Sequence, residues 1–270
     1  MANIHPTAIV DPAAELDDSV EIGPYCIVGP NVKIGPDTAV GAHCIVDGHT
    51  TIGRGNRLFP NVILGHEPQD LKYHGEPSVL TIGDHNDIRE NVTMHGGTEN
   101  GGGTTTVGSR NMIMIGVHVA HDSHIGDHVL IANNALLAGH ITICDYANLG
   151  GGVAIHHYVT IGRYAFIGGV SRVVHDCPPF MITDGHPSAV RGINLIGLSR
   201  HEFDKASIDR LKKAYLRLYK RGNRQTQLET IQQLEQELGE DEYIRELCGF
   251  VRATGASTHG RQSEVGRRDD

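Results

Sequence analysis

The sequence predicts a mainly β fold, a parallel β-helix of hexapeptide repeats followed by a small α-helical domain. Three observations predict it. An aliphatic residue recurs at every sixth position through most of residues 1–180, and the apolar spacing becomes helical after about residue 200. The composition is the third: 34 Gly, no Trp and 5% aromatic residues in 270 require a core of small aliphatic side chains.

The six-residue period is unbroken over long stretches. Eleven successive positions from Ile4 to Leu64 are Ile, Val or Leu, and twelve more run from Val107 to Val173. A hexad of this kind is typical of a short strand and a tight corner, with Gly or Asn easing the turn. Three hexads, about 18 residues, make one triangular coil, and coils stack about 4.8 Å apart. The repeat therefore predicts a β-helical prism over residues 1–180.

Two interruptions cannot fit a coil and are predicted to loop out, namely residues 65–81 and 95–106. They are either tolerated surface insertions or loops that line a site, as loops on rigid scaffolds often do. Asp70, Lys72 and Tyr73 in the first insertion favour the second interpretation.

The chain after the prism is expected to change character. Two prolines in DCPPF, residues 176–180, end the prism, and residues 181–200 are expected to form a connecting segment. Residues 201–253 are predicted to be α-helical, because apolar residues follow helical spacing and Thr226 with Glu229 forms a capping box. Residues 254–270 are predicted to be a disordered tail.

Charge and composition exclude several function classes. A net charge of −9 argues against a general nucleic-acid binder. No apolar run is long enough for a membrane span, and the first residues do not resemble a signal peptide. Five scattered cysteines indicate a reducing compartment. We therefore expect a cytoplasmic protein.

Three histidines in one short stretch, His118, His121 and His124, indicate a metal site, a general base or a surface cluster. The coil length of about 18 residues, which we call the coil arithmetic, indicates which histidines lie close together. His121 and His140 fall on one face of adjacent coils, and His156 lies near that face one coil further on. This convergence predicts a functional edge of the prism.

The motifs HEPQDLKYHGEP, HVAHDSHIG and ANNALLAGH, on a hexapeptide prism with a helical C-terminus, closely resemble the acyl-carrier-protein–UDP-N-acetylglucosamine O-acyltransferases. The resemblance implies a left-handed β-helix, a homotrimer with active sites between prisms, and acyl transfer to the sugar 3-hydroxyl at the start of lipid A synthesis. It implies no metal and no cofactor, because the acyl chain arrives on the phosphopantetheine of acyl carrier protein.

The resemblance also implies residue roles. His121 is the general base, Asp122 orients it, and the backbone N–H of Gly139 is the oxyanion donor. The positions that match substrate-binding residues of the family are Gln69, Asp70, Lys72, His95, His118, His140, His156, Gly169, Asn194 and Arg200. Three positions depart from the family pattern: His157, Ile196 and His201.

Two alternatives stay open at this point. The same site would N-acylate a sugar carrying a 3-amine, and a carbonic-anhydrase-like metalloenzyme shares the prism and uses histidines. Sensitivity to a chelator separates the metalloenzyme from the transferase.

The segment Arg200–Arg224 holds nine basic and three acidic residues in an otherwise acidic chain. It is either a solvated helix face or a docking surface for an acidic partner. Because the family's acyl carrier protein is acidic, we expect that protein to dock there.

Overall fold

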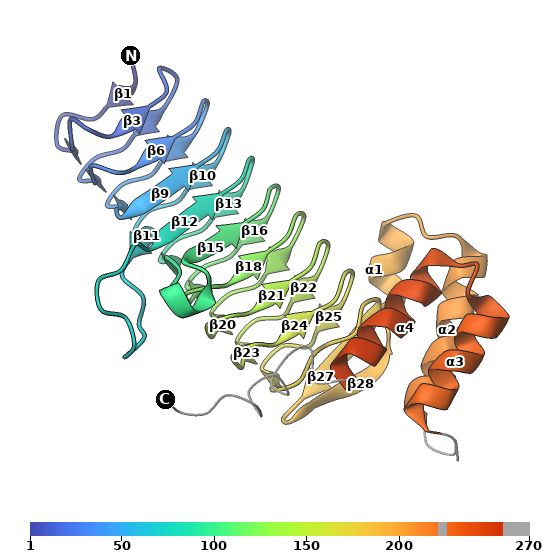
Figure 1. Ribbon diagram of the computed structural model, residues 1–270. Coiled ribbons are helices and arrows are strands. Elements are labelled where there is room, and N and C mark those ends of the chain that lie inside the picture. The colour runs from blue at the N-terminus through green and yellow to red at the C-terminus, as the bar shows by residue number, and fades with distance from the viewer. Residues whose placement is uncertain (221–225, 256–270) are drawn as a thin grey trace.

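The structure, a computed structural model, describes residues 1–220 and 226–255. Most hexads form a two-residue strand whose second residue points inward, and three strands make one coil of a left-handed parallel β-helix. The coils stack into a long prism that ends against a group of helices (Figure 1).

Three sheets form the faces of the prism. The first contains β1 (Asn3–Ile4), β4 (Glu21–Ile22), β7 (Ala39–Val40), β10 (Arg57–Leu58), β13 (Asp87–Ile88), β16 (Met112–Ile113), β19 (Leu130–Ile131), β22 (Asn148–Leu149), β25 (Phe166–Ile167), β27 (Met181–Gly185) and β28 (Ser188–Ile193). The second contains β2 (Ile9–Val10), β5 (Ile27–Val28), β8 (Ile45–Val46), β11 (Ile63–His66), β14 (Thr93–His95), β17 (His118–Val119), β20 (Leu136–Leu137), β23 (Ala154–Ile155) and β26 (Arg172–Val173). The third contains β3 (Glu15–Leu16), β6 (Lys33–Ile34), β9 (His49–Ile52), β12 (Val79–Ile82), β15 (Thr104–Val107), β18 (His124–Ile125), β21 (Thr142–Ile143) and β24 (Thr160–Ile161).

The predicted period sets both register and core. Residues 18 apart pair in parallel, as Ile4 does with Ile22, so each aliphatic residue stacks on its equivalent in the next coil. The stacked side chains form one continuous core from Val20 to Cys177. The first coil is less buried, with Ile4 at 41% exposure, because its N-terminal edge has no coil above it.

The corners differ from the expectation in one respect. The glycine after the aliphatic residue does not supply the turn: a Cβ on Gly23 would lie 2.9 Å from the carbonyl oxygen of Val40 in the next coil. Close backbone approach therefore requires glycine there. The left-handed corner residue comes two positions later, as at Tyr25, where φ is 59°, and at His43 and Asn61.

A loop leaves the prism at each of the two insertions, with shorter bounds than the sequence suggests. The loops proper span residues 67–78 and 96–103, because strands β11, β12, β14 and β15 continue into the predicted segments. The first projects beside β11 (Figure 1).

Three buried asparagines hold the coils in register next to the insertions: Asn56 Oδ1 accepts from the N–H of Asn86 at 2.9 Å, and Asn86 Oδ1 accepts from the N–H of Asn111 at 2.9 Å.

The segment expected to be a simple connection, residues 181–200, is structured. β27 pairs in parallel with β25 and then folds back antiparallel on β28, and α1 (Leu195–Arg200) follows. This hairpin lies outside the six-residue period, so the repeat did not indicate it.

Three longer helices complete the described chain: α2 (Lys205–Tyr219), α3 (Gln227–Leu238) and α4 (Glu242–Gly255). The capping box of Thr226 and Glu229 is present at the start of α3. A second hydrophobic core joins the hairpin to the helices through residues such as Phe180, Leu211 and Leu247. The predicted disordered tail lies mostly outside the described residues. No helix in the described ranges is long and apolar enough to cross a bilayer.

Candidate active site

A buried histidine–aspartate pair stands at the corner that follows β17. His121 Nδ1 lies 2.7 Å from Asp122 Oδ2, and the two residues are 5% and 1% exposed. Asp122 adopts the left-handed corner conformation, with φ at 57°, and its N–H donates to Thr105 Oγ1 at 2.8 Å. The pairing through Nδ1 leaves His121 Nε2 as the ring nitrogen that faces away from Asp122.

The carboxylate of Asp122 is held in its charged form. Burial by itself would raise its pKa, but hydrogen bonds from His121 and Thr98 lower it, and the net pKa lies below the ordinary value. A charged carboxylate fixes the ring orientation of the histidine and stabilises the imidazolium that forms when the ring takes a proton.

The first insertion brings a second carboxylate to the other side of the ring. Asp70 Oδ2 lies 4.0 Å from His121 Nε2, and Asp70 Oδ1 accepts from the N–H of Lys72 at 3.0 Å. Gln69 and Lys72 are exposed on the same loop. Of the predicted residues of this loop, Asp70 therefore lies beside the histidine of the pair within one chain.

His140 stands on the next coil, as the coil arithmetic predicts. Its ring lies 5.2 Å from that of His121 in an edge-to-face arrangement, and its Nε2 lies 3.7 Å from Asp122 Oδ2. Tyr158 stacks on it at 4.5 Å. His157, a departure from the family pattern, places its ring 6.5 Å from His121.

His156 is tied to its neighbour. Its Nδ1 lies 3.3 Å from the carbonyl oxygen of His157, and the two rings meet edge-to-face at 5.5 Å. The two side chains extend the histidine cluster one coil further along the prism.

Two further histidines line the prism above the pair. His118 Nδ1 lies 2.7 Å from Thr93 Oγ1, and the His118 ring meets that of His95 edge-on at 5.0 Å. Burial lowers the pKa of His95 to about 4, helped by the nearby His118 and His66. His95 Nδ1 is buried without a hydrogen-bond partner among the described residues. His95 is one of the residues that line a cavity of about 740 Å³, together with Gln69 and Tyr73 of the first insertion loop.

This burial gives a pH prediction. Because the folded pKa of His95 lies below the unfolded one, the unfolded chain binds the additional proton, and stability falls as the pH drops from about 6.5 to 4. His95→Gln is expected to lose less free energy of unfolding over that range than the wild type, by up to about 3 kcal/mol. Denaturant titrations at pH 6.5, 5.5 and 4.5 measure the difference, with exposed His124→Gln as control. An equal loss in His95→Gln contradicts it.

Gly139 leaves space for the imidazole ring of His121. A Cβ at this position would lie 2.5 Å from His121 Cε1 and 2.7 Å from Nε2. The N–H of Gly139 donates to no group within residues 1–220 and 226–255.

Three of the residues predicted to bind substrate do not lie beside His121 of the same chain. Asn194 caps α1: its Oδ1 accepts from the N–H of Gly197 at 3.0 Å, and its Nδ2 donates to the carbonyl oxygen of Tyr164 at 2.9 Å. Gly169 and Arg200 are exposed. Among the described residues, no hydrogen bond or ion pair joins any of the three to His121.

Two departures from the family pattern lie near the same helix. His201 packs edge-on against Tyr146 at 4.9 Å and Tyr164 at 5.1 Å. Ile196 is 68% exposed.

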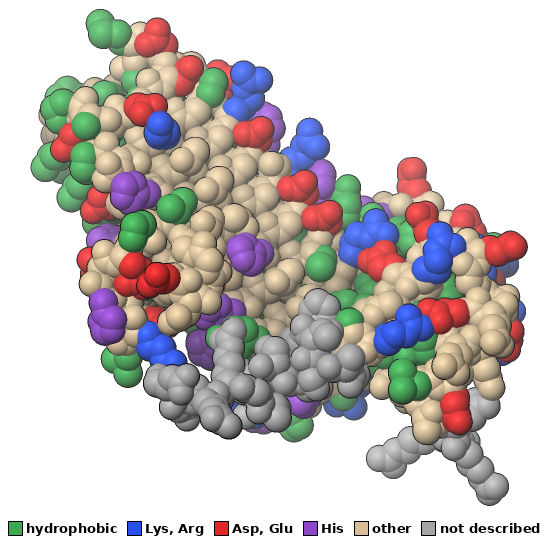
Figure 2. Space-filling model, viewed as in Figure 1, with side chains coloured by type: hydrophobic (Ala, Val, Ile, Leu, Met, Phe, Trp, Pro, Cys, Tyr) green, Lys and Arg blue, Asp and Glu red, His purple; other side chains and the backbone are tan. Residues whose placement is uncertain are grey.

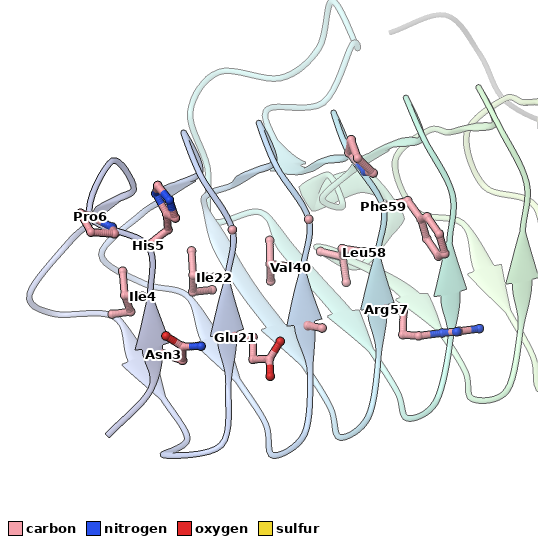
Figure 3. A pocket seen from close by; sticks show the side chains of 14 residues that line it. Asn3, Ile4, His5, Pro6, Glu21, Ile22, Val40, Arg57, Leu58 and Phe59 are labelled. Carbon is pink, nitrogen blue, oxygen red and sulfur yellow. The ribbon is translucent and has the colours of Figure 1, made fainter.

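A second hollow is separate from this cluster. A groove of about 520 Å³ crosses the first sheet near the N-terminus, with Ile22 and Val40 in its floor and Arg57 and Phe59 at one end (Figure 3). It lies on β1, β4, β7 and β10, coils away from His121 on the β17 corner. Its lining includes His5 and Glu21, but no hydrogen bond or ion pair joins these two described residues, whereas His121 is bonded to Asp122.

A metal would have to compete with existing bonds at the pair. In the described part of the chain, His121, Asp122 and His140 have ligand atoms within 4.8 Å of one another. His118, which could have supplied a second histidine ligand beside His121, is not in that group. The nitrogen that His121 would offer on this side already pairs with Asp122 at 2.7 Å. The arrangement suits a base oriented by a carboxylate.

Comparisons with known proteins show the family of the chain. Residues 176–261 match the family described as Udp N-acetylglucosamine O-acyltransferase, Domain 2, and residues 13–48 and 104–139 match Bacterial transferase hexapeptide (six repeats). The chain is 48% identical over 251 residues to the acyl-[acyl-carrier-protein]–UDP-N-acetylglucosamine O-acyltransferase of Anaeromyxobacter sp., covering 93% of this chain and 97% of that one. It is 49% identical over 222 residues to the enzyme of the same name from Verminephrobacter eiseniae, covering 82% and 85%.

Solved structures give the same result over nearly the whole length. LpxA of Acinetobacter baumannii superposes with a TM-score of 0.89 at 38% identity and covers 96% of this chain and 98% of its own. The UDP-N-acetylglucosamine acyltransferase of Francisella novicida gives 0.89 at 34% identity, with 99% of both chains covered. The chain belongs to the acyl-[acyl-carrier-protein]–UDP-N-acetylglucosamine O-acyltransferase family.

Proposed function

We propose that this protein transfers a 3-hydroxyacyl chain from acyl carrier protein to the 3-hydroxyl of UDP-N-acetylglucosamine, the first step of lipid A biosynthesis. The buried pair of His121 and Asp122 is the observation that carries the proposal. One ring nitrogen is occupied by a charged carboxylate, and the other faces the space beside Asp70 and Gly139.

The chemistry follows from this geometry. His121 Nε2 takes the proton of the sugar 3-hydroxyl as that oxygen attacks the thioester carbonyl. The N–H of Gly139 donates to the oxyanion of the tetrahedral intermediate. Collapse of the intermediate forms the ester and breaks the C–S bond, and the imidazolium of His121 returns the proton to the leaving phosphopantetheine thiolate. Asp122 keeps the ring oriented and stabilises its protonated form.

The remaining predicted residues are proposed to bind substrate. Asp70 contacts the acceptor sugar, because its carboxylate lies beside the reacting nitrogen of His121. Lys72 supplies a positive charge for the diphosphate. The other binding positions near the pair are Gln69, His95, His118, His140 and His156.

The binding site is proposed to be completed by a second copy of the chain. Gly169, Asn194 and Arg200 do not reach His121 within one chain, so their proposed contacts with the acyl chain and nucleotide require a neighbouring prism. A homotrimer with sites between prisms provides that second wall. The reaction needs no metal and no cofactor, and the substrates place the enzyme in the cytoplasm.

An acyl-transfer assay tests the function. The purified protein is given 3-hydroxyacyl carrier protein and either UDP-N-acetylglucosamine or its 3-amino analogue, with and without EDTA. We expect O-acylation that EDTA leaves unchanged. Loss of activity with EDTA would favour the metalloenzyme, and transfer to the amine alone would favour the N-acyltransferase. Chains of several lengths are needed, because each buried methylene contributes about 0.8 kcal/mol.

The acyl carrier protein is proposed to dock on the basic segment near Arg200–Arg224. Fewer positive charges of this segment are unpaired than the number of its Lys and Arg residues indicates. Arg210 pairs with Asp241, and Arg217 pairs with Glu237 at 2.7 Å. Lys and Arg side chains are interleaved with Asp and Glu over the helices (Figure 2). Lys205 and Lys213 are exposed and have no ion pair within the described residues. Arg221 and Arg224 lie outside those residues.

Reversing Lys212 and Lys213 to Glu is expected to raise the KM for acyl carrier protein about tenfold at low salt. The reversal adds repulsion against an acidic partner, and the effect fades as salt screens the charges. Steady-state kinetics at 20 and 300 mM NaCl measure it, with Lys33→Glu near the other end of the prism as control. An unchanged KM at low salt would contradict docking there.

A further inference from the structure

The second insertion loop holds Asp122 through Thr98. The N–H of Thr98 donates to Asp122 Oδ1 at 2.8 Å, and its hydroxyl donates to Oδ2 at 2.7 Å. The same Oδ2 lies 2.7 Å from His121 Nδ1. Thr98 and Asp122 are 2% and 1% exposed, so water does not replace these bonds.

The Thr98 side chain does not cap the turn that follows it, so its hydroxyl can bond to Asp122. Thr98 precedes the 3-10 turn η1 (Glu99–Gly101), where a threonine hydroxyl usually accepts from an N–H of the turn itself. No such bond forms here. The Thr98 carbonyl instead accepts from the N–H groups of Gly101 and Gly103, at 3.0 and 2.7 Å, which fixes the backbone.

Gly101 closes the loop over the carboxylate. A Cβ at Gly101 would lie 2.0 Å from Asp122 Cγ and 2.2 Å from Oδ1. The loop backbone therefore packs directly against Asp122, and the carboxylate has no space to rotate on that side. An insertion that was merely tolerated at the surface would not require this close contact with Asp122.

We propose that Thr98 is a positioning residue for the acyl transfer, fixing the plane of the Asp122 carboxylate that aligns His121 and neutralising part of its charge. The inference rests on the proposed function, because it requires His121 to be the base. Outer-shell partners that orient histidine ligands in metal sites typically change affinity or activity by about 10- to 100-fold when removed, and we expect an effect of the same order for Thr98.

Because Thr98 neutralises part of the charge of Asp122, its loss is expected to change the pH dependence of kcat/KM. The titratable groups around the pair are Asp70 and His140 within 4.0 Å, then His118, His95 and His157. None of them replaces the hydroxyl that Thr98 gives to Oδ2. Without that hydroxyl, the more negative carboxylate stabilises the imidazolium form of His121, which cannot accept a proton. The acid limb of the kcat/KM profile then moves to higher pH.

Three variants of the full-length protein test the proposal. Thr98→Val removes the hydroxyl and keeps the N–H, Thr98→Ser restores a hydroxyl, and Thr106→Val makes the same change at a residue whose hydroxyl bonds His124 instead. We expect Thr98→Val to lower kcat/KM about tenfold and shift its acid limb upward, by analogy with other orienting residues. Thr98→Ser and Thr106→Val are expected to resemble the wild type in both measurements.

A wild-type kcat/KM and pH profile in folded Thr98→Val would overturn the proposal, even if its melting temperature fell. If Thr98→Val does not fold, Gly101→Ala decides, because its new Cβ pushes the Asp122 carboxylate away from Thr98 and so breaks the same hydrogen bonds. A loss with the same upward shift supports the proposal, and wild-type behaviour overturns it. Activity retained by His121→Ala would instead refute the base assignment of the proposed function.

Discussion

His121→Ala is expected to lower kcat by about 100-fold or more, the range lost with a general base. No neighbouring group takes over its role. Asp70 Oδ2 is 4.0 Å from His121 Nε2 and the His140 ring centre is 5.2 Å from that of His121, so neither group occupies the position of the reacting nitrogen. Because the imidazole acts mainly in the transition state, we expect kcat to fall much more than the KM for the sugar nucleotide changes.

The neighbouring His124 provides a matched control for this experiment. It belongs to the same histidine-rich stretch but is exposed, and it lies 2.9 Å from Thr106 Oγ1. His124→Ala is expected to keep kcat within about twofold of wild type, as surface substitutions usually do. If His121→Ala retained more than a tenth of the wild-type kcat, the base would have to be another group.

The prism was predictable because its period is specified many times over. Each aliphatic position from Ile22 to Val173 stacks on equivalents 18 residues away outside the insertions, so a single exception does not change the register. The hairpin of β27 and β28 and helix α1 were not predictable from that signal, because they occur only once. The role of the glycines was also misread, since close approach between coils depends on three-dimensional stacking.

The centre of the site was predictable for the same reason. The coil arithmetic places His121 and His140 on adjacent corners, and the family motif adds Asp122 and Asp70. Thr98 carried no signal, because it lies in the aperiodic stretch HGGTENGGG, where nothing indicates which residue it contacts. The ion pairs of Arg210 and Arg217 carried no signal either, because their partners, Asp241 before α4 and Glu237 in α3, are distant in sequence.

Gly139→Ala is expected to lower kcat/KM by about 100-fold, the loss that a misplacement of about 1 Å can cause. The new Cβ would lie 2.5 Å from His121 Cε1, so the ring must move away from Asp122 or from the substrate. The backbone of Gly139 is not left-handed, so alanine fits the chain itself, and it keeps the N–H proposed as oxyanion donor. Melting temperatures check that the variant folds.

Combining Gly139→Ala with His121→Ala separates the two roles of this position. If the methyl group acts only by displacing the ring, the double variant is no worse than His121→Ala alone, because there is no ring left to displace. A further loss of about tenfold would mean that alanine also disturbs the oxyanion donor. Gly249→Ala in α4, where no atom lies within 4 Å of the new Cβ, is the control and should keep wild-type activity. Full activity in Gly139→Ala would contradict the geometry, since it would mean that His121 works from a different position.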